Sequence, residues 1–341
     1  MKALQFLVIG KNPEILETLK RVIEKNEGWQ AKLCAGENEG CEQIRTSQPD
    51  LVFLSSGLEQ AAEIRIRECC RSVSPEIKVI DHYGGGSGLV KSEVESCFAE
   101  PLAIGSPVIH RAGSRGKTDL GWLLSEKTFS FGDYYDPSHI QFGALRVLND
   151  DTVEAGRGFG VHPHDNMEIV SIALQGTLIH EDNLGNRTEI KSGDIQVMSA
   201  GTGVTHSEFS KDEGDTVRFL QIWVYPRTRN VSPRYGQLTL DRTKSKNRFQ
   251  QILSPDPDDE GVWIHQDAWF HLGSFENNTE TSYRTRKEGN GIYIFVIEGS
   301  LEVEGETLER RDGFGIREVS ELKMKMVSEG TEVLVMEVPV I

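Results

Sequence analysis

The sequence predicts a multidomain chain, with an α/β domain at the N-terminus and two all-β barrels after it. Strand and helix patterns alternate through the first hundred residues, whereas from Pro107 onward short strands are separated by turns rich in Gly, Asn and Asp. A chain of 341 residues is long enough for about two or three domains that each bury a core. We therefore expect an α/β domain at residues 1–100, a first barrel at 107–235 and a second barrel at 236–341.

Hydrophobic patterns predict the elements of the N-terminal domain. Apolar runs indicate buried strands at residues 3–9, 29–35, 50–54 and 77–80. Pro13, after Asn12 as N-cap, marks the start of the first helix, and further helices are expected around Ile44, at 59–71 and at 89–98. Because strands and helices alternate, the sheet should be parallel with helices on both faces. The glycine-rich run at 84–88 is predicted to be either a flexible hinge or a long helix-capping turn.

The remaining chain shows strand and turn signals without long helices. The segment 182–186 lies between the runs 178–181 and 188–190, which predicts a hairpin. The apolar run 292–299 is a prominent strand of the second half. The length of this part favours two barrels, related by distant duplication.

Composition excludes several functional classes. A net charge of -16 and a pI of about 5.1 oppose direct binding to nucleic-acid phosphates or anionic lipid. No run approaches 18 apolar residues and the start of the chain does not read as a signal peptide, so we expect a cytoplasmic protein without a membrane span. All five cysteines lie in the first hundred residues without a CxxC pair, which favours reduced thiols.

Two residue pairs predict a metal site. His162 and His164 are spaced i, i+2, as are His206 and Glu208 some forty residues later. Side chains two apart on a strand point to the same face, so two such pairs on neighbouring strands would direct four ligands to one point. Three imidazoles and one carboxylate suit a divalent first-row metal with a position left open. The alternative, four unrelated polar residues on exposed strands, fits the paired spacing poorly.

Residues 107–341 resemble the pirin family, whose members are bicupins built from two cupin barrels. The segments that carry the resemblance are 128–131 (TFSF), 134–137 (YYDP), 142–147 (FGALRV), 149–151 (NDD), 158–164 (GFGVHPH), 193–198 (GDIQVM), 200–203 (AGTG) and 206–208 (HSE). The resemblance implies that His162, His164, His206 and Glu208 are the metal ligands. It implies iron as the usual metal, with nickel, copper, manganese, cobalt or zinc as alternatives.

Four other acidic or imidazole side chains are candidates besides these ligands. Glu168 matches the carboxylate that many cupins use as a ligand, and strand parity could turn it inward, but the resemblance favours Glu208 as ligand and Glu168 as a supporting or structural acid. His180 is expected to be structural. The second barrel has no HxH pair; its His265 and His271 read as packing or surface residues, as the resemblance to a metal-free C-terminal barrel implies.

The first hundred residues more distantly resemble a response-regulator receiver domain. Residues 49–54 match the segment that ends in a phospho-accepting aspartate there, but Ser55 follows in this chain, and Gly10 to Asn12 replace the expected acidic pair. Phosphoryl transfer needs carboxylates to hold Mg²⁺ and to accept the phosphoryl group. We therefore interpret this domain as a pseudo-receiver with a docking or dimerisation role, the alternative being phosphorylation of Ser55 or Ser56.

The pirin resemblance implies a metal-dependent dioxygenase of the quercetin 2,3-dioxygenase type, acting with O2 on a flavonol or a similar small aromatic enol. Glu208 would be the general base that accepts the proton of the substrate hydroxyl. Phe129, Phe159 and Met198 are candidate walls of the substrate pocket. One alternative is a metal- or redox-sensing regulator that binds a transcription or signalling partner, with residues 1–100 as the possible partner surface. Another is a metal-stabilised scaffold, which a site without thiolates disfavours.

Overall fold

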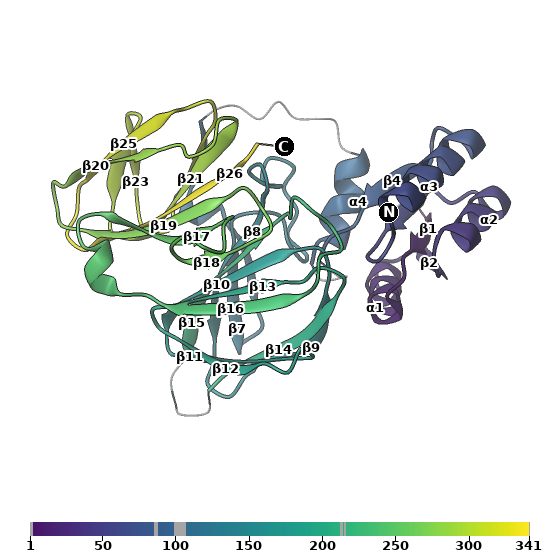
Figure 1. Ribbon diagram of the computed structural model, residues 1–341, viewed down its shortest axis with the longest axis horizontal. Coiled ribbons are helices and arrows are strands. Elements are labelled where there is room, and N and C mark those ends of the chain that lie inside the picture. Colours follow the sequence, from purple (N-terminus) through teal and green to yellow (C-terminus); the bar gives the residue numbers. More distant parts are fainter. Residues whose placement is uncertain (1–2, 85–87, 99–106, 212–213, 215, 341) are drawn as a thin grey trace.

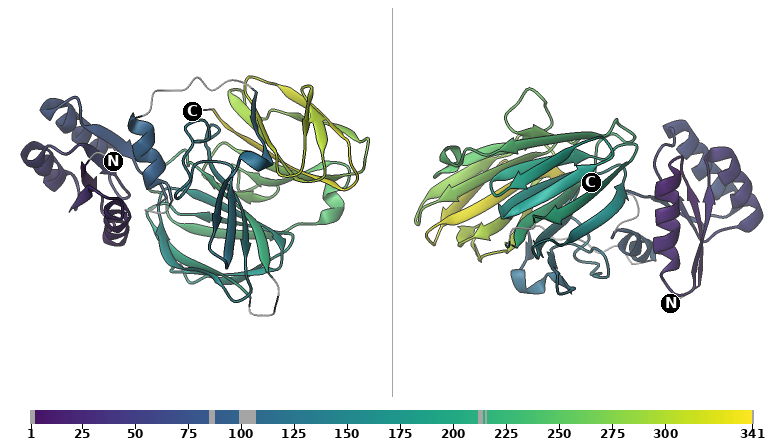
Figure 2. Two further views of the ribbon diagram at one scale, coloured as in Figure 1. Left: turned by 180° about the vertical axis from the view of Figure 1, so that it is seen from behind. Right: turned by 90° about the horizontal axis from the view of Figure 1, so that it is seen from below.

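The computed structural model describes residues 3–84, 88–98, 107–211, 214 and 216–340. The α/β domain stands at one side and the two β-barrels lie next to each other at the other side (Figure 1). Views from behind and from below show the α/β domain meeting the first barrel (Figure 2). No helix in the described part of the chain is long and apolar enough to span a bilayer. The predicted division into an α/β part and an all-β part is confirmed.

The α/β domain has a four-stranded parallel sheet with strand order β2-β1-β3-β4. Its strands are β1 (Leu4–Ile9), β2 (Trp29–Cys34), β3 (Leu51–Leu54) and β4 (Lys78–Asp81). Its helices are α1 (Pro13–Glu24), α2 (Glu37–Ser47), α3 (Gln60–Val73) and α4 (Val90–Phe98). As the sequence predicts, Pro13 begins α1, and the Asn12 side chain caps that helix by accepting from the backbone N–H groups of Glu14 and Ile15.

Helices cover both faces of this sheet because its strands are apolar on both sides. On one face Phe6, Val8 and Phe53 pack against residues of α1 and α4, such as Leu19 and Val94. The residues between them on β1 and β3 pack against α2 and α3 on the other face. Side chains alternate between the two faces along each strand, so the sheet carries one apolar core on each face, as expected for a βαβ sequence pattern.

The first barrel consists of two facing sheets. The seven-stranded sheet has the order β16-β13-β10-β15-β8-β7-β6, and the four-stranded sheet has the order β12-β11-β14-β9. The strands are β6 (Gly116–Asp119), β7 (Leu123–Lys127), β8 (Leu145–Val153), β9 (Gly158–His164), β10 (Glu168–Gln175), β11 (Thr177–Asp182), β12 (Arg187–Lys191), β13 (Asp194–Ser199), β14 (Val204–Ser210), β15 (Val217–Val224) and β16 (Arg234–Thr239). The predicted hairpin is the pair β11 and β12.

The second barrel repeats this design. Its sheets have the orders β18-β17-β19-β26-β21-β24-β5 and β20-β25-β22-β23. The strands are β5 (Val108–His110), β17 (Phe249–Ser254), β18 (Val262–Trp263), β19 (Trp269–Phe275), β20 (Glu280–Arg284), β21 (Asn290–Glu298), β22 (Leu301–Val303), β23 (Glu306–Leu308), β24 (Gly313–Ile316), β25 (Glu321–Met326) and β26 (Thr331–Pro339). Two short 3-10 helices, Ala112–Ser114 and Arg242–Ser245, complete the described elements.

Two strands place residues in a different barrel from the one that the predicted boundaries give. Residues 108–110, which were expected to open the first barrel, pair with β24 of the second barrel. The expected boundary at residue 235 falls inside β16, which pairs with β13 and so remains in the first barrel. Both differences arise because the chain crosses from one barrel to the other through extended strands, which leave no break in the sequence pattern.

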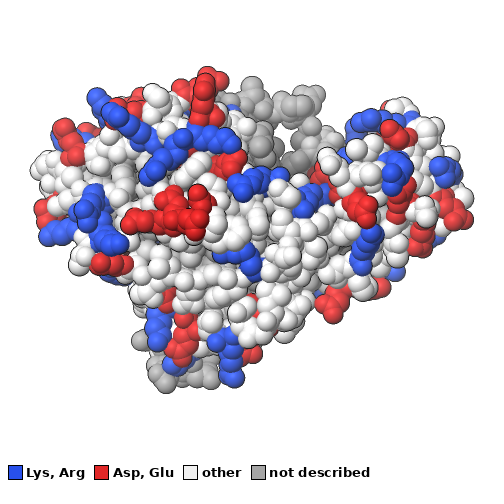
Figure 3. Space-filling view, in the orientation of Figure 1, with Lys and Arg blue, Asp and Glu red and all other residues white. Residues whose placement is uncertain are grey.

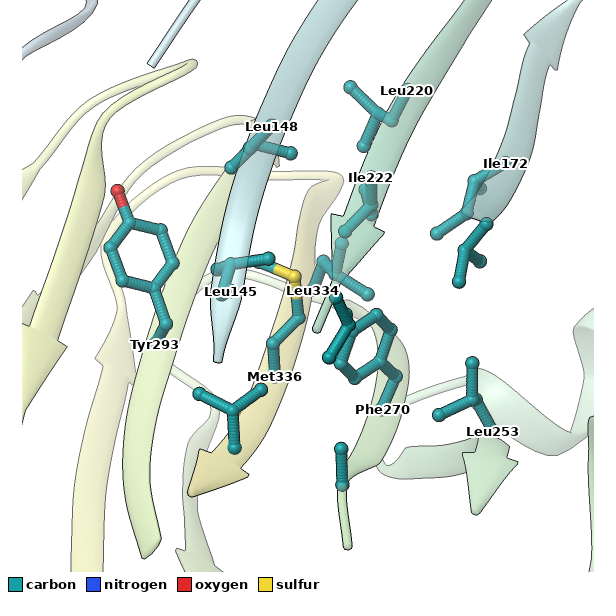
Figure 4. Close-up of a cluster of buried hydrophobic side chains, with 14 of the residues drawn as sticks. Leu145, Leu148, Ile172, Leu220, Ile222, Leu253, Phe270, Tyr293, Leu334 and Met336 are labelled. Atoms are coloured by element: carbon teal, nitrogen blue, oxygen red, sulfur yellow. The ribbon is translucent and has the colours of Figure 1, made fainter. Parts of the chain in front are cut away.

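A shared apolar core joins the two barrels. Leu148, Ile172 and Ile222 of the first barrel pack in one cluster with Phe270 and Met336 of the second (Figure 4). Each of these side chains is at most 2% exposed, and burying one contributes about 1.5–3 kcal/mol. The two barrels therefore form one packed unit.

Candidate metal centre

The two predicted ligand pairs lie on neighbouring antiparallel strands. His162 and His164 are on β9, and His206 and Glu208 are on β14, with His206 directly opposite His162 in the register. The ligand nitrogens of the three histidines all lie within 4.8 Å of one another. Glu208 instead forms a second group of the same size with His206 and His180. The register of β14 against β9 shifts between residues 206 and 208, and this shift coincides with the separation of Glu208 from His162 and His164.

Hydrogen bonds on Nδ1 leave the Nε2 atoms of these histidines for a ligand. His162 Nδ1 lies 2.7 Å from the Gly160 carbonyl oxygen, and His164 Nδ1 lies 3.1 Å from the Gly84 carbonyl oxygen. A carbonyl oxygen only accepts, so both Nδ1 atoms carry the proton and both Nε2 atoms carry the lone pair. The buried Nε2 of His206 has no hydrogen-bond partner among the described residues. This is the arrangement that metal-binding histidines use.

The electrostatics of the site favour neutral imidazoles, which are the form that binds a metal. Burial lowers the pKa of His164 and His206 well below the usual value, and the neighbouring imidazoles lower both further. Burial also lowers the pKa of His162, against the opposing effect of its bond to Gly160. Only 1% of His164 and 2% of His206 are exposed, while Val161, which precedes His162 on β9, is 78% exposed. The site therefore lies just beneath the surface.

A buried chain of polar groups stands behind His206. His180 Nε2 lies 3.1 Å from Asp182 Oδ2, and His180 Nδ1 lies 3.4 Å from His206 Nδ1. Hydrogen bonds from Asn186 and His180 outweigh burial and hold the pKa of Asp182 below its usual range, so Asp182 is ionised. His180 therefore donates from Nε2 to Asp182 and accepts at Nδ1 from His206. That assignment leaves the His206 Nε2 lone pair directed into the site.

Comparison with known proteins identifies the family of the barrels. The family model described as Pirin matches residues 109–224, and the one described as the quercetinase C-terminal cupin domain matches residues 251–338. A protein of Escherichia coli (strain K12) named quercetin 2,3-dioxygenase is 37% identical over 231 residues, which are 68% of this chain and 98% of that protein. The chain belongs to the pirin family.

A solved structure and a further sequence relative agree with this assignment. The bacterial pirin YhhW from Escherichia coli, in complex with nickel(II), is 35% identical with a TM-score of 0.65, and the match covers 69% of this chain and 100% of that one. A pirin-like protein of Caulobacter vibrioides is 36% identical over 221 residues, which are 64% of this chain and 94% of that protein. Neither family model reaches the α/β domain.

Glu208 differs from the other predicted pirin ligands in its electrostatics. It is 3% exposed, and its Oε1 atom has no hydrogen-bond partner in the described part of the chain. Burial raises the pKa of Glu208 to about 8, and the charge of Asp151 on β8 adds to this. Burial likewise raises the pKa of Asp151 to about 7. A cation between these carboxylates and the histidines would favour their ionised forms.

Glu168 lies on the opposite face of β10 from the barrel interior. Its Oε2 atom accepts a hydrogen bond of 2.7 Å from Ser199 Oγ, and it shares its face of the strand with Val170, which packs in the core between the barrels. It is in neither group of clustered ligands. The even spacing between His164 and Glu168 does not place them on the same face, because a turn through Asn166, with φ 45°, separates β9 from β10. Glu168 thus lies away from the clustered ligands, in a position that suits a structural acid.

Other predicted residues divide between the site and the cores. Met198 packs with Trp223 and Val204, and the Trp223 ring meets the His164 ring edge-on at 5.0 Å. Phe159 lies 6.5 Å from His162, between ring centroids. Phe129 is not a wall of this site, because it packs against Tyr293 in the core between the barrels.

Sequence reasoning missed the proximity of His180 to the ligands. The pairing of β11 with β14 sets His180 opposite Glu208. The hairpin of β11 and β12 is visible in the sequence, but it does not reveal that β11 also pairs with β14. Without that second pairing, the position of His180 could not be predicted. In the second barrel, His265 and His271 join no group of clustered ligands among the described residues.

A cavity of about 510 Å³ lies between the two barrels, lined by residues such as Arg218, Arg242 and Phe275. It contains none of the clustered histidines. The chemistry of the histidine group, not the size of this cavity, therefore locates the candidate site.

Proposed function

We propose that this pirin is a metal-dependent dioxygenase of the quercetin 2,3-dioxygenase type. The observation that carries the proposal is the convergence of three neutral imidazoles, each with its Nε2 lone pair left for a metal, beside the Glu208 carboxylate. The name of the Escherichia coli relative and the nickel complex of YhhW support the same reading. The substrate we propose is a flavonol or a similar small aromatic enol, with O2 as the second substrate.

The residues fit a divalent first-row metal. His162, His164 and His206 would hold the ion, with Glu208 as the fourth ligand or as the base beside it. We propose iron, with nickel, copper, manganese, cobalt or zinc as alternatives. A bound ion would supply Lewis acidity, which lowers the pKa of a hydroxyl that it coordinates.

The remaining chemistry belongs to the protein. Burial raises the pKa of Glu208 to about 8, and the charge of a bound ion would favour its ionised form, which can accept the proton of an enol hydroxyl. The Trp223 ring, which packs in one apolar cluster with Met198 and Ile169, meets the His164 ring edge-on and excludes water from that side of the histidine. The Asp182–His180 pair keeps His206 in one tautomer.

Turnover measured with defined metals tests the proposal. Protein loaded separately with iron, nickel, copper or manganese is supplied with a flavonol, and oxygen-dependent loss of the flavonol is followed together with release of carbon monoxide. We expect turnover in at least one metal form, its loss in His162→Ala and Glu208→Ala, and its retention in His265→Ala, a histidine of the second barrel. Stoichiometric metal without turnover in any form would contradict the dioxygenase proposal.

A regulatory role is the second candidate, and the α/β domain is the observation that favours it. Its strand order β2-β1-β3-β4 matches the first four strands of the five-stranded flavodoxin-like order, to which receiver domains belong. Ser55 and Ser56 are at most 1% exposed in the contact with the first barrel, which favours docking over phosphorylation. Acidic and basic side chains are interspersed on the face shown in Figure 3, so a protein partner suits the surface better than nucleic acid.

A further inference from the structure

The α/β domain contacts the first barrel directly beside the candidate ligands. Ser55 and Ser56 follow β3, at the carboxyl edge of the parallel sheet, where open α/β sheets bind their ligands. Asp165, which follows the ligand His164, occupies this edge. Its Oδ2 atom accepts hydrogen bonds from Ser56 N at 3.0 Å and from Ser55 Oγ at 3.3 Å. The Asp165 carboxylate of the barrel thus lies at the edge of the sheet where open α/β sheets bind their ligands.

Gly84 of the α/β domain bonds to two successive residues of the barrel. Its N–H donates to the Asp165 carbonyl oxygen at 2.8 Å, and its carbonyl oxygen accepts from His164 Nδ1 at 3.1 Å. Gly84 has φ 87°, and a Cβ atom there would lie 3.1 Å from the Trp223 ring. Both the positive φ and this close approach favour glycine at this position.

The contact is extensive enough to hold the two parts in one arrangement. Leu89 is fully buried in one apolar cluster with Val147, Ile169 and Trp223 of the barrel. Polar contacts surround this cluster. Arg229 bonds to Glu63 at 2.9 Å and to the Leu54 carbonyl oxygen at 3.2 Å, and Asn230 bonds to Gly57 N and to the Leu58 carbonyl oxygen, each at 2.8 Å.

We propose that the α/β domain is a positioning part of the metal centre, in which the Gly84 carbonyl holds His164 in the tautomer that leaves Nε2 for the metal. This rests on the proposed metal site. Gly84 is a positioning residue, because it acts through His164 and does not touch the ion. Hydrogen bonds to the far nitrogen of a ligating histidine fix its ring and its tautomer, and removing them weakens metal binding. The α/β domain, which neither family model includes, therefore contributes a positioning group to the site of this chain.

The first test needs no metal. Nitrogen-15 NMR of the histidine side chains in the metal-free full-length protein reports which ring nitrogen of His164 carries the proton. We expect the Nδ1–H tautomer, with Nε2 unprotonated. The Nε2–H tautomer at His164 would overturn the proposal, even if every variant failed to fold.

The second test compares two matched glycine substitutions in the full chain. Gly84→Ala adds a Cβ against Trp223 at a positive φ, whereas Gly121→Ala imposes the same kind of backbone strain at φ 81° with no atom within 4 Å of the new Cβ. Titration with Ni²⁺ should show an affinity weakened about 10- to 100-fold in Gly84→Ala and unchanged in Gly121→Ala. Wild-type affinity in folded Gly84→Ala would overturn the proposal. If the wild-type protein bound no metal, the proposed metal site would be wrong. The tautomer of His164 measured by NMR would still test the role of Gly84.

Discussion

Replacing Asp182 with Asn should weaken metal binding by inverting the hydrogen bonds behind His206. In the wild-type protein, Asp182 Oδ1 accepts from the N–H groups of Leu184 and Asn186 and from the Asn186 side chain, whereas Oδ2 faces Asn186 and His180 Nε2. The backbone donors require an oxygen at the Oδ1 position. The new amide NH2 must therefore face His180, which can then no longer donate from Nε2.

The consequence reaches the metal through two imidazoles. With its Nε2 accepting from the amide, His180 carries its proton on Nδ1 and donates to His206 Nδ1, so His206 carries its proton on Nε2. That proton occupies the position of a metal–ligand bond. Losing such a supporting interaction typically costs about 10- to 100-fold in metal affinity, or about 1.4–2.8 kcal/mol. The 3.4 Å separation of the two Nδ1 atoms is long for a hydrogen bond, which favours the lower end of this range.

The assay is competition for Ni²⁺ against a chromophoric chelator, with NMR of the histidine rings as a second measurement. Asp194→Asn is the matched control, because Asp194 is also a buried aspartate that accepts from a turn N–H and a side-chain amide, those of Lys191 and Gln237. An affinity equal to wild type in Asp182→Asn, with His206 Nε2 still unprotonated, would refute the reasoning.

Three further predictions concern stability. Burial raises the pKa of Glu168 from 4.5 to about 7, so this group should lower wild-type stability by up to about 3 kcal/mol as pH rises from 4.5 through 7. Glu168→Gln should remove that part of the pH slope and leave the part that Asp151 and Glu208 contribute. Urea unfolding at several pH values checks this, and equal slopes in both proteins would contradict it. Phe270→Ala, in the core between the barrels, should cost about 3–5 kcal/mol, whereas loss under 1 kcal/mol would mean that the barrels are not packed as described. Ni²⁺ at 1,000 times its Kd should stabilise the protein by about 4 kcal/mol, an effect that should disappear in His206→Ala and that thermal unfolding measures.

The sequence predicts local geometry well where one strand carries the whole pattern. The i, i+2 spacing of His162 and His164 suffices to put both imidazoles on one face, and the alternating apolar positions of β1 predict the two-faced sheet of the α/β domain. The less favoured alternative, Glu168 as a ligand, depended on strand parity continuing past His164, and a turn breaks that continuity. Parity is therefore informative only within an uninterrupted strand.

Features that depend on contacts distant in sequence could not be predicted. His180 is next to His206 because β11 pairs with β14, and Gly84 reaches His164 across 80 residues of chain. Phe129 was expected at the site but packs between the barrels, since an apolar side chain alone does not indicate which core it joins. The sequence of the glycine-rich run fits either a hinge or a capping turn, and residues 85–87 of it lie outside the described part of the chain. Its first residue, Gly84, makes a specific contact with the barrel.

We propose that the Nε2 atoms of His162, His164 and His206 together hold one metal ion. The most direct measurement is the anomalous-difference density of crystals of the full chain loaded with Ni²⁺, recorded on both sides of the nickel absorption edge. We predict one strong peak at about 2.0–2.1 Å from each of the three Nε2 atoms. A peak elsewhere in the molecule, or no peak although the solution contains stoichiometric nickel, would contradict the account.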